Sequence, residues 1–403
     1  MSNFSFTVRT RLPGSLARTG VIITPHGAIE TPAFIVVGTK ATVKALTMEQ
    51  TAAAGAQAVL ANAYHLYLQP GHELIEKAGG LGRFMNWNKP TFTDSGGFQV
   101  LSLGSGYKKT LAMETAGLTV DDIIAPAKAR QAFVDDDGVD FISYRDGSKH
   151  RFTPEFSMQV QHAIGADITF AFDELTSLVD SYEYQVESLE KRTEPWAERS
   201  LAEVKRLREL HPERAYQALF GVVQGAQHQD LRERAARFLG TRDFDGFGIG
   251  GAIEKSKLGD IVRWVNEILP EGKPKHMLGI SEPDDIFLAI EQGIDTFDCV
   301  SPTRVARNGA FYTYSGRFNI RGAKYREDFT PLVSGCTCYT CQNYTRAYLQ
   351  HLDRSKELLF NTLMSIHNEH FIIKLVDDIR HSIEDGSFYV FRDSWLRNYY
   401  GKA

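Results

Sequence analysis

Short apolar runs alternate with longer amphipathic segments along most of the chain. Eight runs have the length and apolar composition of buried strands, and they cover residues 33–37, 58–61, 91–93, 168–172, 219–223, 247–249, 277–279 and 296–299. Apolar residues recur at helical spacing in segments between them, namely 42–54, 154–164, 231–239, 258–268 and 283–292. This alternation predicts an α/β protein with a parallel sheet.

Polar residues at the ends of these predicted strands favour a barrel over an open sheet. Both a (β/α)8 barrel and a doubly wound open sheet alternate strands with helices. Eight strands suit the barrel, in which all the carboxyl ends meet on one face. The residues that would converge there are Asn62, Asp94, Asp173, Gln224, Gly251 and Asp298. We therefore predict a TIM barrel with its functional site at this face.

Two segments interrupt the alternation. Residues 104–133 are long and irregular, so we expect an insertion at the surface rather than a lid. Residues 182–210 have helical spacing but contain Pro195, which predicts a kink or two helices. Together with the cysteine-rich C-terminal part, these features predict two domains. The barrel would span residues 1–320, with the insertion at about 104–133, and a smaller subdomain would span residues 321–403.

Composition narrows the classes of function. Of the 403 residues, 43% are hydrophobic and 24% charged, which is ordinary for a globular protein with a large core. No run approaches 18 apolar residues and the first residues do not resemble a signal peptide, so we expect a cytoplasmic protein that does not span a membrane. The formal net charge of −5 implies that any RNA site is a local basic patch.

Three of the four cysteines are crowded into Cys336-Thr-Cys338-Tyr-Thr-Cys341. With His367, which lies in a helical-looking stretch, they form a set of three thiolates and one imidazole. Such a set fills a tetrahedral zinc site and leaves no position for water or substrate, so one Zn²⁺ per subunit would be structural. Unliganded thiols in a reducing compartment are the alternative. The fourth cysteine, Cys299, is expected to be a small core residue.

Residues 304–326 are basic and aromatic, with no acidic residue. The basic members are Arg304, Arg307, Arg317, Arg321, Lys324 and Arg326, and the aromatic members are Phe311, Tyr312, Tyr314, Phe318 and Tyr325. Most basic runs are solvated surface. The position of this one directly after the strand that carries Asp298 favours a binding site for phosphates and unstacked bases. A polyanion whose single nucleobase enters a pocket would fit such a strip beside a barrel mouth.

These motifs, in this order and spacing, resemble those of the bacterial tRNA-guanine transglycosylases from about Arg18 to Tyr389. The matching stretches are Thr-Asp-Ser-Gly-Gly-Phe-Gln at 93–99, Ala-Phe-Asp-Glu at 171–174, Gln224-Gly225, Gly250-Gly251, Phe-Asp-Cys-Val-Ser-Pro-Thr-Arg at 297–304 and the Cys/His set. The resemblance implies a zinc-containing TIM barrel that works as a homodimer. Its implied substrates are tRNAs of the Asp, Asn, His and Tyr type, with G-U-N anticodons. Guanine at wobble position 34 would be exchanged for a 7-deazaguanine, preQ1 or queuine, in queuosine biosynthesis.

The resemblance also implies catalytic roles for two carboxylates. Asp298 would be the nucleophile that attacks C1′ of the ribose, leaving a covalent ribosyl-enzyme, as in a retaining glycosidase. Asp94 would be the general acid and base that assists the departing guanine and then takes the N9 proton of the incoming base.

The remaining site residues follow from the same resemblance. Asp173 would accept hydrogen bonds from N1–H and the exocyclic amine of the purine, while Gln224 and the backbone N–H of Gly251 would donate to O6. Phe98 and Leu278 would enclose the ring beside Ser95, Gly96 and Gly97. The RNA would be held by two segments, Gly279-Ile280-Ser281-Glu282-Pro283-Asp284-Asp285 and Thr303-Arg304-Val305-Ala306-Arg307. Tyr344 and Tyr348, one helical turn apart in sequence, would belong to the homodimer interface.

The chain departs from the family pattern where the substituent of the incoming base would lie. Residues 252–256 read Ala-Ile-Glu-Lys-Ser where many bacterial members have Leu-x-Val-Gly-Glu, and Leu175 stands where a smaller residue is frequent. The choice between preQ1 and queuine is therefore left open. A zinc-dependent hydrolase is disfavoured by the closed ligand set. A non-catalytic tRNA-binding partner subunit is disfavoured by the presence of both Asp94 and Asp298.

Overall fold

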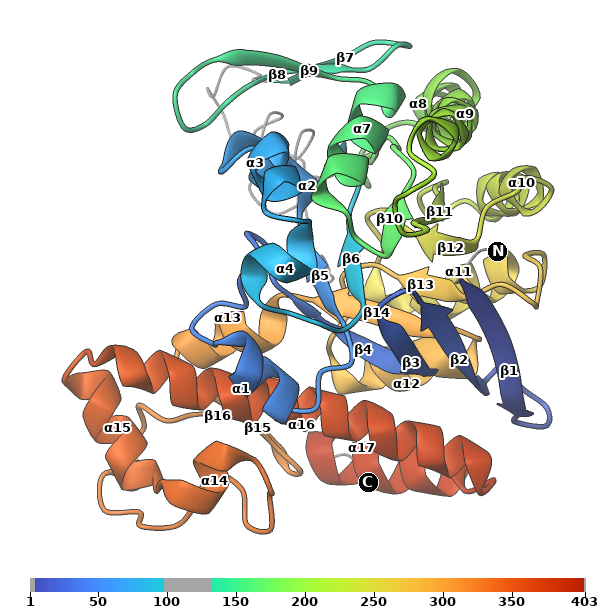
Figure 1. Cartoon of the computed structure of the whole chain (residues 1–403). Helices are drawn as coiled ribbons and strands as arrows, with labels where there is room; N and C mark the ends of the chain where they lie inside the picture. The colour runs from blue at the N-terminus through green and yellow to red at the C-terminus, as the bar shows by residue number, and fades with distance from the viewer. Residues whose placement is uncertain (1–3, 98–131, 402–403) are drawn as a thin grey trace.

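The computed structural model describes residues 4–97 and 132–401, and its centre is a closed barrel of eight parallel strands (Figure 1). In order around the barrel these are β4 (Ala33–Val37), β5 (Val59–Ala61), β6 (Thr91–Thr93), β10 (Ile168–Phe170), β11 (Ala218–Val223), β12 (Gly246–Ile249), β13 (Lys275–Met277) and β14 (Thr296–Cys299), which pairs with β4. Each of the eight predicted strands is a barrel strand, with ends shifted by at most two residues. The prediction of a TIM barrel is confirmed, and an open sheet is excluded.

Helices surround the barrel, and the five predicted between strands are all present. They are α1 (Met48–Ala53), α7 (Pro154–Ile164), α10 (Gln229–Gly240), α11 (Leu258–Asn266) and α12 (Pro283–Glu291). The first is shorter than predicted because Thr47 forms a capping box with Gln50 and fixes the start of the helix. Ala41 and Ala45 before it have positive φ angles, which no α-helix can contain. Short helices α2 (Ala63–Leu68), α3 (His72–Lys77), α4 (Leu81–Met85) and α13 (Ser301–Arg307) complete this layer.

The segment with Pro195 is two helices, as predicted. They are α8 (Tyr182–Ser188) and α9 (Glu194–Leu210), and a π-helical segment, Leu189–Thr193, joins them. Pro195 is the second residue of α9, directly after the π-helical segment, and as a proline it has no N–H to donate to a carbonyl of that segment.

An N-terminal antiparallel sheet, which the sequence analysis missed, closes the amino-terminal end of the barrel. Its strands are β1 (Ser5–Arg11), β2 (Arg18–Thr24) and β3 (Gly27–Thr31). Phe6, Ile22 and Ile29 from this sheet pack into one apolar cluster with Phe170 and Phe220 from the barrel interior. Since this end of the barrel is filled, only the carboxyl-terminal face is left for a site.

A second antiparallel sheet stands between β6 and α7. It consists of β7 (Ala132–Val134), β8 (Val139–Ile142) and β9 (Lys149–Phe152), and it packs on α2 through Tyr64 and Phe141. The last two residues of the predicted insertion, 104–133, belong to β7. The others lie outside the described residues, so the expected surface role stays a prediction.

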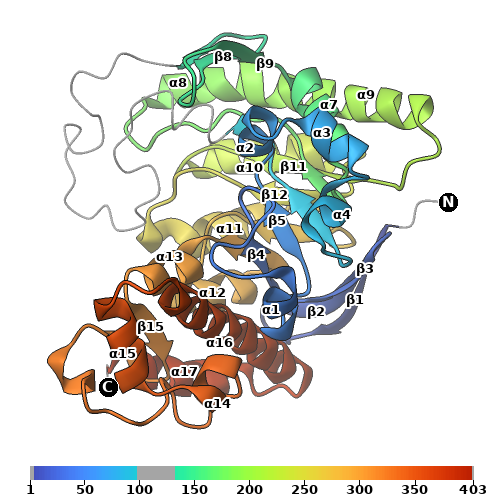
Figure 2. The same cartoon turned by 60° about the vertical axis from the view of Figure 1, so that its left-hand side comes forward.

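The C-terminal part of the chain packs beside the barrel, on the side opposite the β7–β9 sheet (Figures 1 and 2). A hairpin of β15 (Ala310–Thr313) and β16 (Gly316–Asn319) precedes α14 (Tyr339–Asn343), α15 (Arg346–Arg354), α16 (Leu358–Glu384) and α17 (Phe388–Tyr400). The long helix α16 contacts barrel strand β4, α13 and β15. The predicted domain boundary at residue 320 stays a prediction. In the described ranges no helix combines the length and apolarity needed to cross a membrane.

A buried ion pair joins the N-terminal sheet to the barrel, and it supplies a test of the fold. Arg18 donates to both oxygens of Asp295, at 2.9 and 2.7 Å, and the two side chains are 4% and 0% exposed. Arg18→Gln leaves a buried carboxylate without its cation, so we expect the free energy of unfolding to fall by about 3–5 kcal/mol in urea denaturation. Arg9→Gln breaks the exposed pair with Glu30 and should cost less than about 1 kcal/mol. Equal losses in the two variants would contradict this account.

Candidate active site and metal centre

A cavity of about 670 Å³ opens at the carboxyl-terminal face of the barrel. The structure brings together there the predicted residues at the carboxyl ends of six strands: Asn62, Asp94, Asp173, Gln224, Gly251 and Asp298 all line it. Leu278, which follows a seventh strand, β13, lines it as well. Ser95, Gly96, Leu175 and Ala252 line it too. Gly97 lies just behind, where a Cβ would meet the carbonyl oxygen of Asp173 at 2.7 Å. Phe98 lies outside the described residues.

Asp94 follows β6 and is held by the start of α2. One carboxylate oxygen accepts from the backbone N–H of Ala63 at 2.9 Å, and the other accepts from the side-chain amide of Asn62, the N-cap of α2. Burial, together with the negative charge of Asp298, raises the pKa of Asp94 to about 7, although its hydrogen bonds act in the opposite direction. The two carboxylates are therefore close enough to interact. Near neutral pH Asp94 is poised between its acid and base forms.

Asp173 follows β10 and contacts two polar side chains. Its oxygens accept from Gln224 Nε2 at 2.6 Å and from Ser95 Oγ at 3.2 Å. Burial raises its pKa to about 6, an effect that these hydrogen bonds oppose. In this structure Gln224 thus donates to Asp173, and its Oε1 is buried without a partner among the described residues.

Asp298, in β14, is hydrogen-bonded to the neighbouring strand β13. Its Oδ1 lies 3.1 Å from His276 Nε2 and accepts from the backbone N–H of Gly279 at 3.3 Å. His276 is fully buried, and its Nδ1 lies 2.9 Å from Thr296 Oγ1. The sequence analysis missed His276 because it placed the strand at 277–279, so this histidine lay just before the predicted strand rather than at its carboxyl end. In the structure the strand is Lys275–Met277 and contains His276. A histidine directly next to a predicted barrel strand was the available signal.

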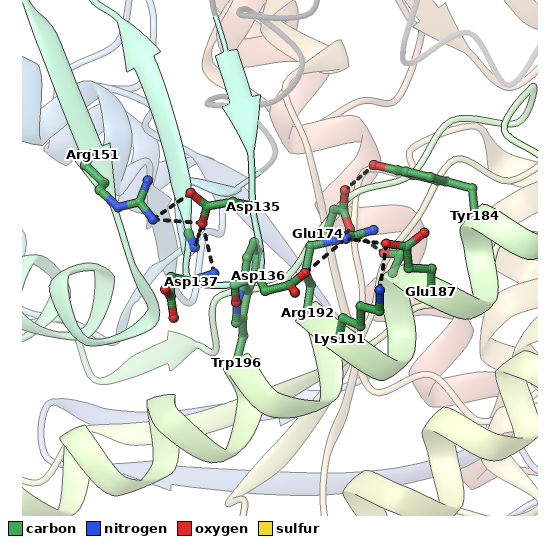
Figure 3. Close-up of polar contacts among 12 residues, drawn as sticks. Asp135, Asp136, Asp137, Arg151, Glu174, Tyr184, Glu187, Lys191, Arg192 and Trp196 are labelled. Atoms are coloured by element: carbon green, nitrogen blue, oxygen red, sulfur yellow. Dashed lines mark hydrogen bonds and ion pairs between the residues drawn. The ribbon is translucent and has the colours of Figure 1, made fainter.

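Glu174, next to Asp173, anchors this part of the site to the surrounding helices. It accepts from Arg192 Nε at 2.5 Å and from the Tyr184 hydroxyl at 2.7 Å (Figure 3). Arg192 belongs to the π-helical segment and also reaches Asp136, beside the β7–β8 turn, at 3.5 Å. The backbone carbonyl of Asp136 accepts from Trp196 Nε1 at 2.7 Å. The network fixes the loop that carries Asp173 against α8, α9 and the β7–β9 sheet.

A cluster of cations stands at the cavity mouth. Arg304 and Arg307 belong to α13, directly after β14, and both line the cavity. Lys44, which the sequence analysis did not single out, lines it as well. Burial lowers the pKa of Lys44, and nearby positive charges lower it further. Those charges belong to Arg307, Lys40 and Arg304, so the four side chains form one patch. Thr303 lines the cavity, whereas Ala306 is buried and Val305 is partly buried against the core.

The rest of the basic segment does not form a continuous strip. Arg317 pairs with Glu282 and Arg321 pairs with Asp353, both at 2.9 Å. The expectation that its aromatic residues offer stacking surfaces is wrong for three of them, because Phe311, Tyr312 and Tyr325 are buried. Phe311 and Tyr312 are neighbours in β15 and contact His367 and Phe371 of α16, while Tyr325 lies in a short 3-10 helix after the hairpin. Cys299 also differs from expectation, since it is only partly buried and lines the cavity.

The segment from Gly279 to Asp285 lies along one wall of the cavity. Gly279, Ser281, Glu282 and Asp285 line it, whereas Ile280 and Pro283 are buried. Lys255 contacts Asp284 at 2.8 Å and Asp285 at 3.4 Å, and the hydroxyl of Tyr400 in α17 donates to Asp284 at 2.6 Å. The acidic side chains of this wall are thus neutralised by cations or hydrogen-bonded.

A second cavity, of about 370 Å³, lies between α7, α9, strand β10 and the loop that precedes β11. His162, Arg208, Arg214 and Tyr216 are among its lining residues, and no carboxylate is, within the part of the chain described. It therefore lacks the pair of carboxylates that the first cavity contains.

The Cys/His set, at α14 and α16, forms a group of side chains that could hold one metal ion. One ligand atom from each of Cys336, Cys338, Cys341 and His367 lies within 4.8 Å of all the others. From His367 Nδ1 the three sulfurs are 3.9, 3.5 and 3.4 Å away. Sulfur and nitrogen ligands bound to one tetrahedral ion would lie about 3.6 Å apart. His367 Nε2 donates to the carbonyl of Tyr312 at 2.8 Å, which leaves Nδ1 free to bind a metal.

Tyr344 and Tyr348 are stacked, with ring centroids 5.4 Å apart, but they do not share a helix. Tyr344 ends α14, and α15 begins after Thr345, the N-cap. Tyr339 and Tyr348 are 53% and 39% exposed, so the aromatic group is available at the surface.

Comparison with known proteins places the chain in a family. A sequence profile described as Queuine tRNA-ribosyltransferase matches residues 14–401. A queuine tRNA-ribosyltransferase of Pelotomaculum thermopropionicum is 45% identical over 98% of this chain and 99% of its own length. Those of Thermoanaerobacter sp. (strain X514) and Halothermothrix orenii are 45% and 42% identical, over 95% and 100% of this chain and 94% and 99% of their own. The chain belongs to the queuine tRNA-ribosyltransferase family. It is therefore a pentosyltransferase, and the expected resemblance is confirmed.

In this member of the queuine tRNA-ribosyltransferase family, replacing one of the four candidate metal ligands tests whether the Cys/His set binds a metal ion. Cys338 is 3% exposed, so Cys338→Ala leaves three ligands in a buried site. We expect bound metal to fall from about one equivalent and the melting temperature to drop by several degrees, because metal binding contributes to folding. Elemental analysis and thermal denaturation measure the two effects. Cys299→Ala, outside the cluster, should leave the metal content unchanged. A stable wild-type protein without metal would refute the assignment.

Proposed function

We propose that this protein exchanges guanine at wobble position 34 of tRNAs with G-U-N anticodons for a 7-deazaguanine, through a covalent ribosyl-Asp298 intermediate. The observation that carries the proposal is that Asp94 and Asp298 interact within one cavity, with Asp173 on its wall. Family membership supports the overall reaction. The tRNAs would be those of the Asp, Asn, His and Tyr type, and the reaction would take place in the cytoplasm during queuosine biosynthesis.

In the first half of the reaction, Asp298 forms a bond to C1′ as the bond from C1′ to N9 breaks. The electron pair leaves with guanine, and Asp94 donates the proton that neutralises it. In the described part of the chain Oδ1 of Asp298 makes the hydrogen bonds with His276 and Gly279 and Oδ2 makes none, so Oδ2 is the oxygen we assign to the attack. In the second half Asp94 takes the N9 proton of the incoming base, and N9 displaces the carboxylate of Asp298.

The purine would be recognised along its Watson–Crick edge. Asp173 is oriented by Ser95 and would accept from N1–H and the exocyclic amine, which requires its ionised form. Gln224 Nε2 now occupies one oxygen of Asp173, so the incoming base would replace this contact and release the amide for O6. The backbone N–H of Gly251 is the second donor to O6. Leu278, and Phe98 outside the described residues, would enclose the ring.

The tRNA backbone would be held by the cations at the cavity mouth. Arg304 and Arg307 stand beside the nucleophile on α13, and Lys44 adds a third charge. Phosphates flanking a flipped-out nucleotide would meet this patch. The wall from Gly279 to Asp285 would contact bases and riboses rather than phosphates, since its exposed groups are acidic or neutral.

Zn²⁺ is the ion we assign to the metal centre, one per subunit, because three thiolates and one imidazole at these distances are the ligands of a structural zinc site. It would hold α14 to α16 and take no part in the chemistry. The exposed tyrosines Tyr339 and Tyr348, with Tyr344, would anchor the homodimer. Leu175 and Ala252 line the cavity where the 7-substituent would lie, and assays with preQ1 and queuine separately would decide between these bases.

Base exchange with an asparagine variant tests the proposed function. Wild-type protein should incorporate labelled guanine into a G-U-N tRNA, and mass spectrometry of the nucleoside should show the 7-deazaguanine when that base is supplied. Asp298→Asn keeps the shape and removes the anionic nucleophile, so exchange should slow by at least about 10³-fold while tRNA binding persists. Asp260→Asn, an exposed carboxylate on α11, is the control and should exchange normally. Near-normal exchange by Asp298→Asn would place the nucleophile elsewhere.

The pH dependence of the first half-reaction follows from two raised pKa values. Asp173 must be ionised to bind guanine, so the single-turnover rate of guanine release should fall as the pH drops below about 6. Asp94 must be protonated to donate, so the rate should also fall above about 7, by about tenfold per pH unit. Asp94→Asn should lower the rate and abolish the alkaline limb alone. An alkaline limb that persists in this variant would assign the proton to another group.

A further inference from the structure

Arg232, on α10, is a fully buried cation behind the purine site. Its guanidinium donates to three backbone carbonyls, those of Ala226 at 2.8 Å, Val223 at 2.9 Å and Gly250 at 2.8 Å. Among the described residues no acidic side chain pairs with it. Burial lowers its pKa to about 9, so the group is still charged at neutral pH.

A buried charge without a counter-ion is unfavourable, and proteins keep such groups mainly where a site uses them. The other two buried arginines among the described residues have carboxylate partners, Arg18 in Asp295 and Arg192 in Glu174. Arg232 instead lies beneath the ends of β11 and β12, which carry Gln224 and Gly251 into the cavity. Arg232 therefore lies directly behind the part of the cavity where the purine is proposed to bind.

The contact with Gly250 fixes the orientation of one peptide group. In a trans peptide the C=O and the following N–H point in opposite directions. Because the Gly250 carbonyl points at Arg232, the Gly251 N–H points away from it, on the side of the cavity. In the described parts of the chain this N–H donates no hydrogen bond, so it is available to a ligand.

Close packing around Gly251 indicates that the positions of Gly251, Arg232 and Gln224 depend on one another. Gly251 has a φ of +109°, and a Cβ there would lie 2.7 Å from Arg232 Nη2 and 3.0 Å from Gln224 Oε1. Those same two atoms are buried without a hydrogen-bond partner among the described residues. Only glycine fits between them. The peptide, the arginine and the glutamine thus form one polar unit with unused hydrogen-bonding capacity.

We propose that Arg232 is a positioning residue that fixes the Gly250–Gly251 peptide, so that its N–H meets O6 of the purine, and that its charge strengthens this donor. The inference rests on the proposed function and deepens it. As the bond to N9 breaks, negative charge spreads over the departing guanine to O6. A fixed dipole backed by a buried cation stabilises that charge more than it stabilises the neutral bound base.

Base selectivity tests this role. 6-Thioguanine keeps N1–H and the exocyclic amine of guanine but replaces O6 with sulfur, a weaker acceptor. Competition against labelled guanine in the exchange assay gives the ratio of the two affinities. Wild-type protein should prefer guanine, and Arg232→Gln should reduce this preference by at least about fivefold, the effect of one hydrogen bond. Arg232→Lys keeps a charge but loses the fork of donors, and should have a smaller loss of preference.

The matched control is Arg18→Gln, which removes a buried arginine at the opposite end of the barrel. It should lower stability and leave the guanine preference unchanged. An unchanged preference in folded Arg232→Gln or Arg232→Lys would overturn the inference, while absence of guanine exchange in the wild type would overturn the proposed function instead.

If neither Arg232 variant folds, a crystal structure of the wild-type protein with guanine tests whether Arg232 orients the Gly250–Gly251 peptide. The Gly250 carbonyl should remain on Arg232 and the Gly251 N–H should lie within hydrogen-bond distance of O6. A reversed peptide would contradict the proposal.

Discussion

Parallel pairing of the last barrel strand with the first is the constraint on which the site depends. β14 pairs with β4 along its whole length, with Asp298 opposite Ile35, and this pairing closes the barrel. Closure brings the carboxyl ends of all eight strands to one face. Asp94 and Asp298, about 200 residues apart in the chain, interact only because the sheet closes. The N-terminal sheet fills the other end, so the cavity opens in one direction.

Within that cavity, burial of charge sets the chemistry. Asp94, Asp173 and Asp298 all line it, and burial raises the pKa of Asp94 and Asp173 into the range where protons are exchanged near neutrality. Each carboxylate is held differently: Asp94 by the start of a helix, Asp173 by two polar side chains, and Asp298 by a buried histidine and a backbone N–H. Positive charge comes from Arg232, which lies behind the purine pocket, and from Lys44, Arg304 and Arg307 at the cavity mouth.

The sequence reveals the barrel strands because strands buried on both faces read as short apolar runs. It also reveals the carboxylates and the metal ligands, whose residue types are unusual at strand ends or in close spacing. Arg232 and His276 were missed for a physical reason. An arginine in an amphipathic helix is expected to be exposed, and His276 lay just before the predicted strand 277–279. Only the placement of neighbouring chain segments shows that Arg232 is buried and that His276 contacts Asp298. For the aromatic residues of the basic segment the error was the reverse, because residues expected to be exposed are buried. Phe311 and Tyr312 pack against the C-terminal helices instead of being available to RNA.

The central claim is that Asp298 carries the ribose between the two bases. It is tested most directly by mixing the enzyme with a G-U-N tRNA in the absence of an incoming base, quenching in acid, digesting with nuclease and protease, and mapping the modified peptide by mass spectrometry. The account predicts a ribosyl fragment on the peptide that contains Asp298, lost when a 7-deazaguanine is added before the quench. A fragment on Asp94 or another residue, or rapid exchange with no covalent species at any time, would contradict it.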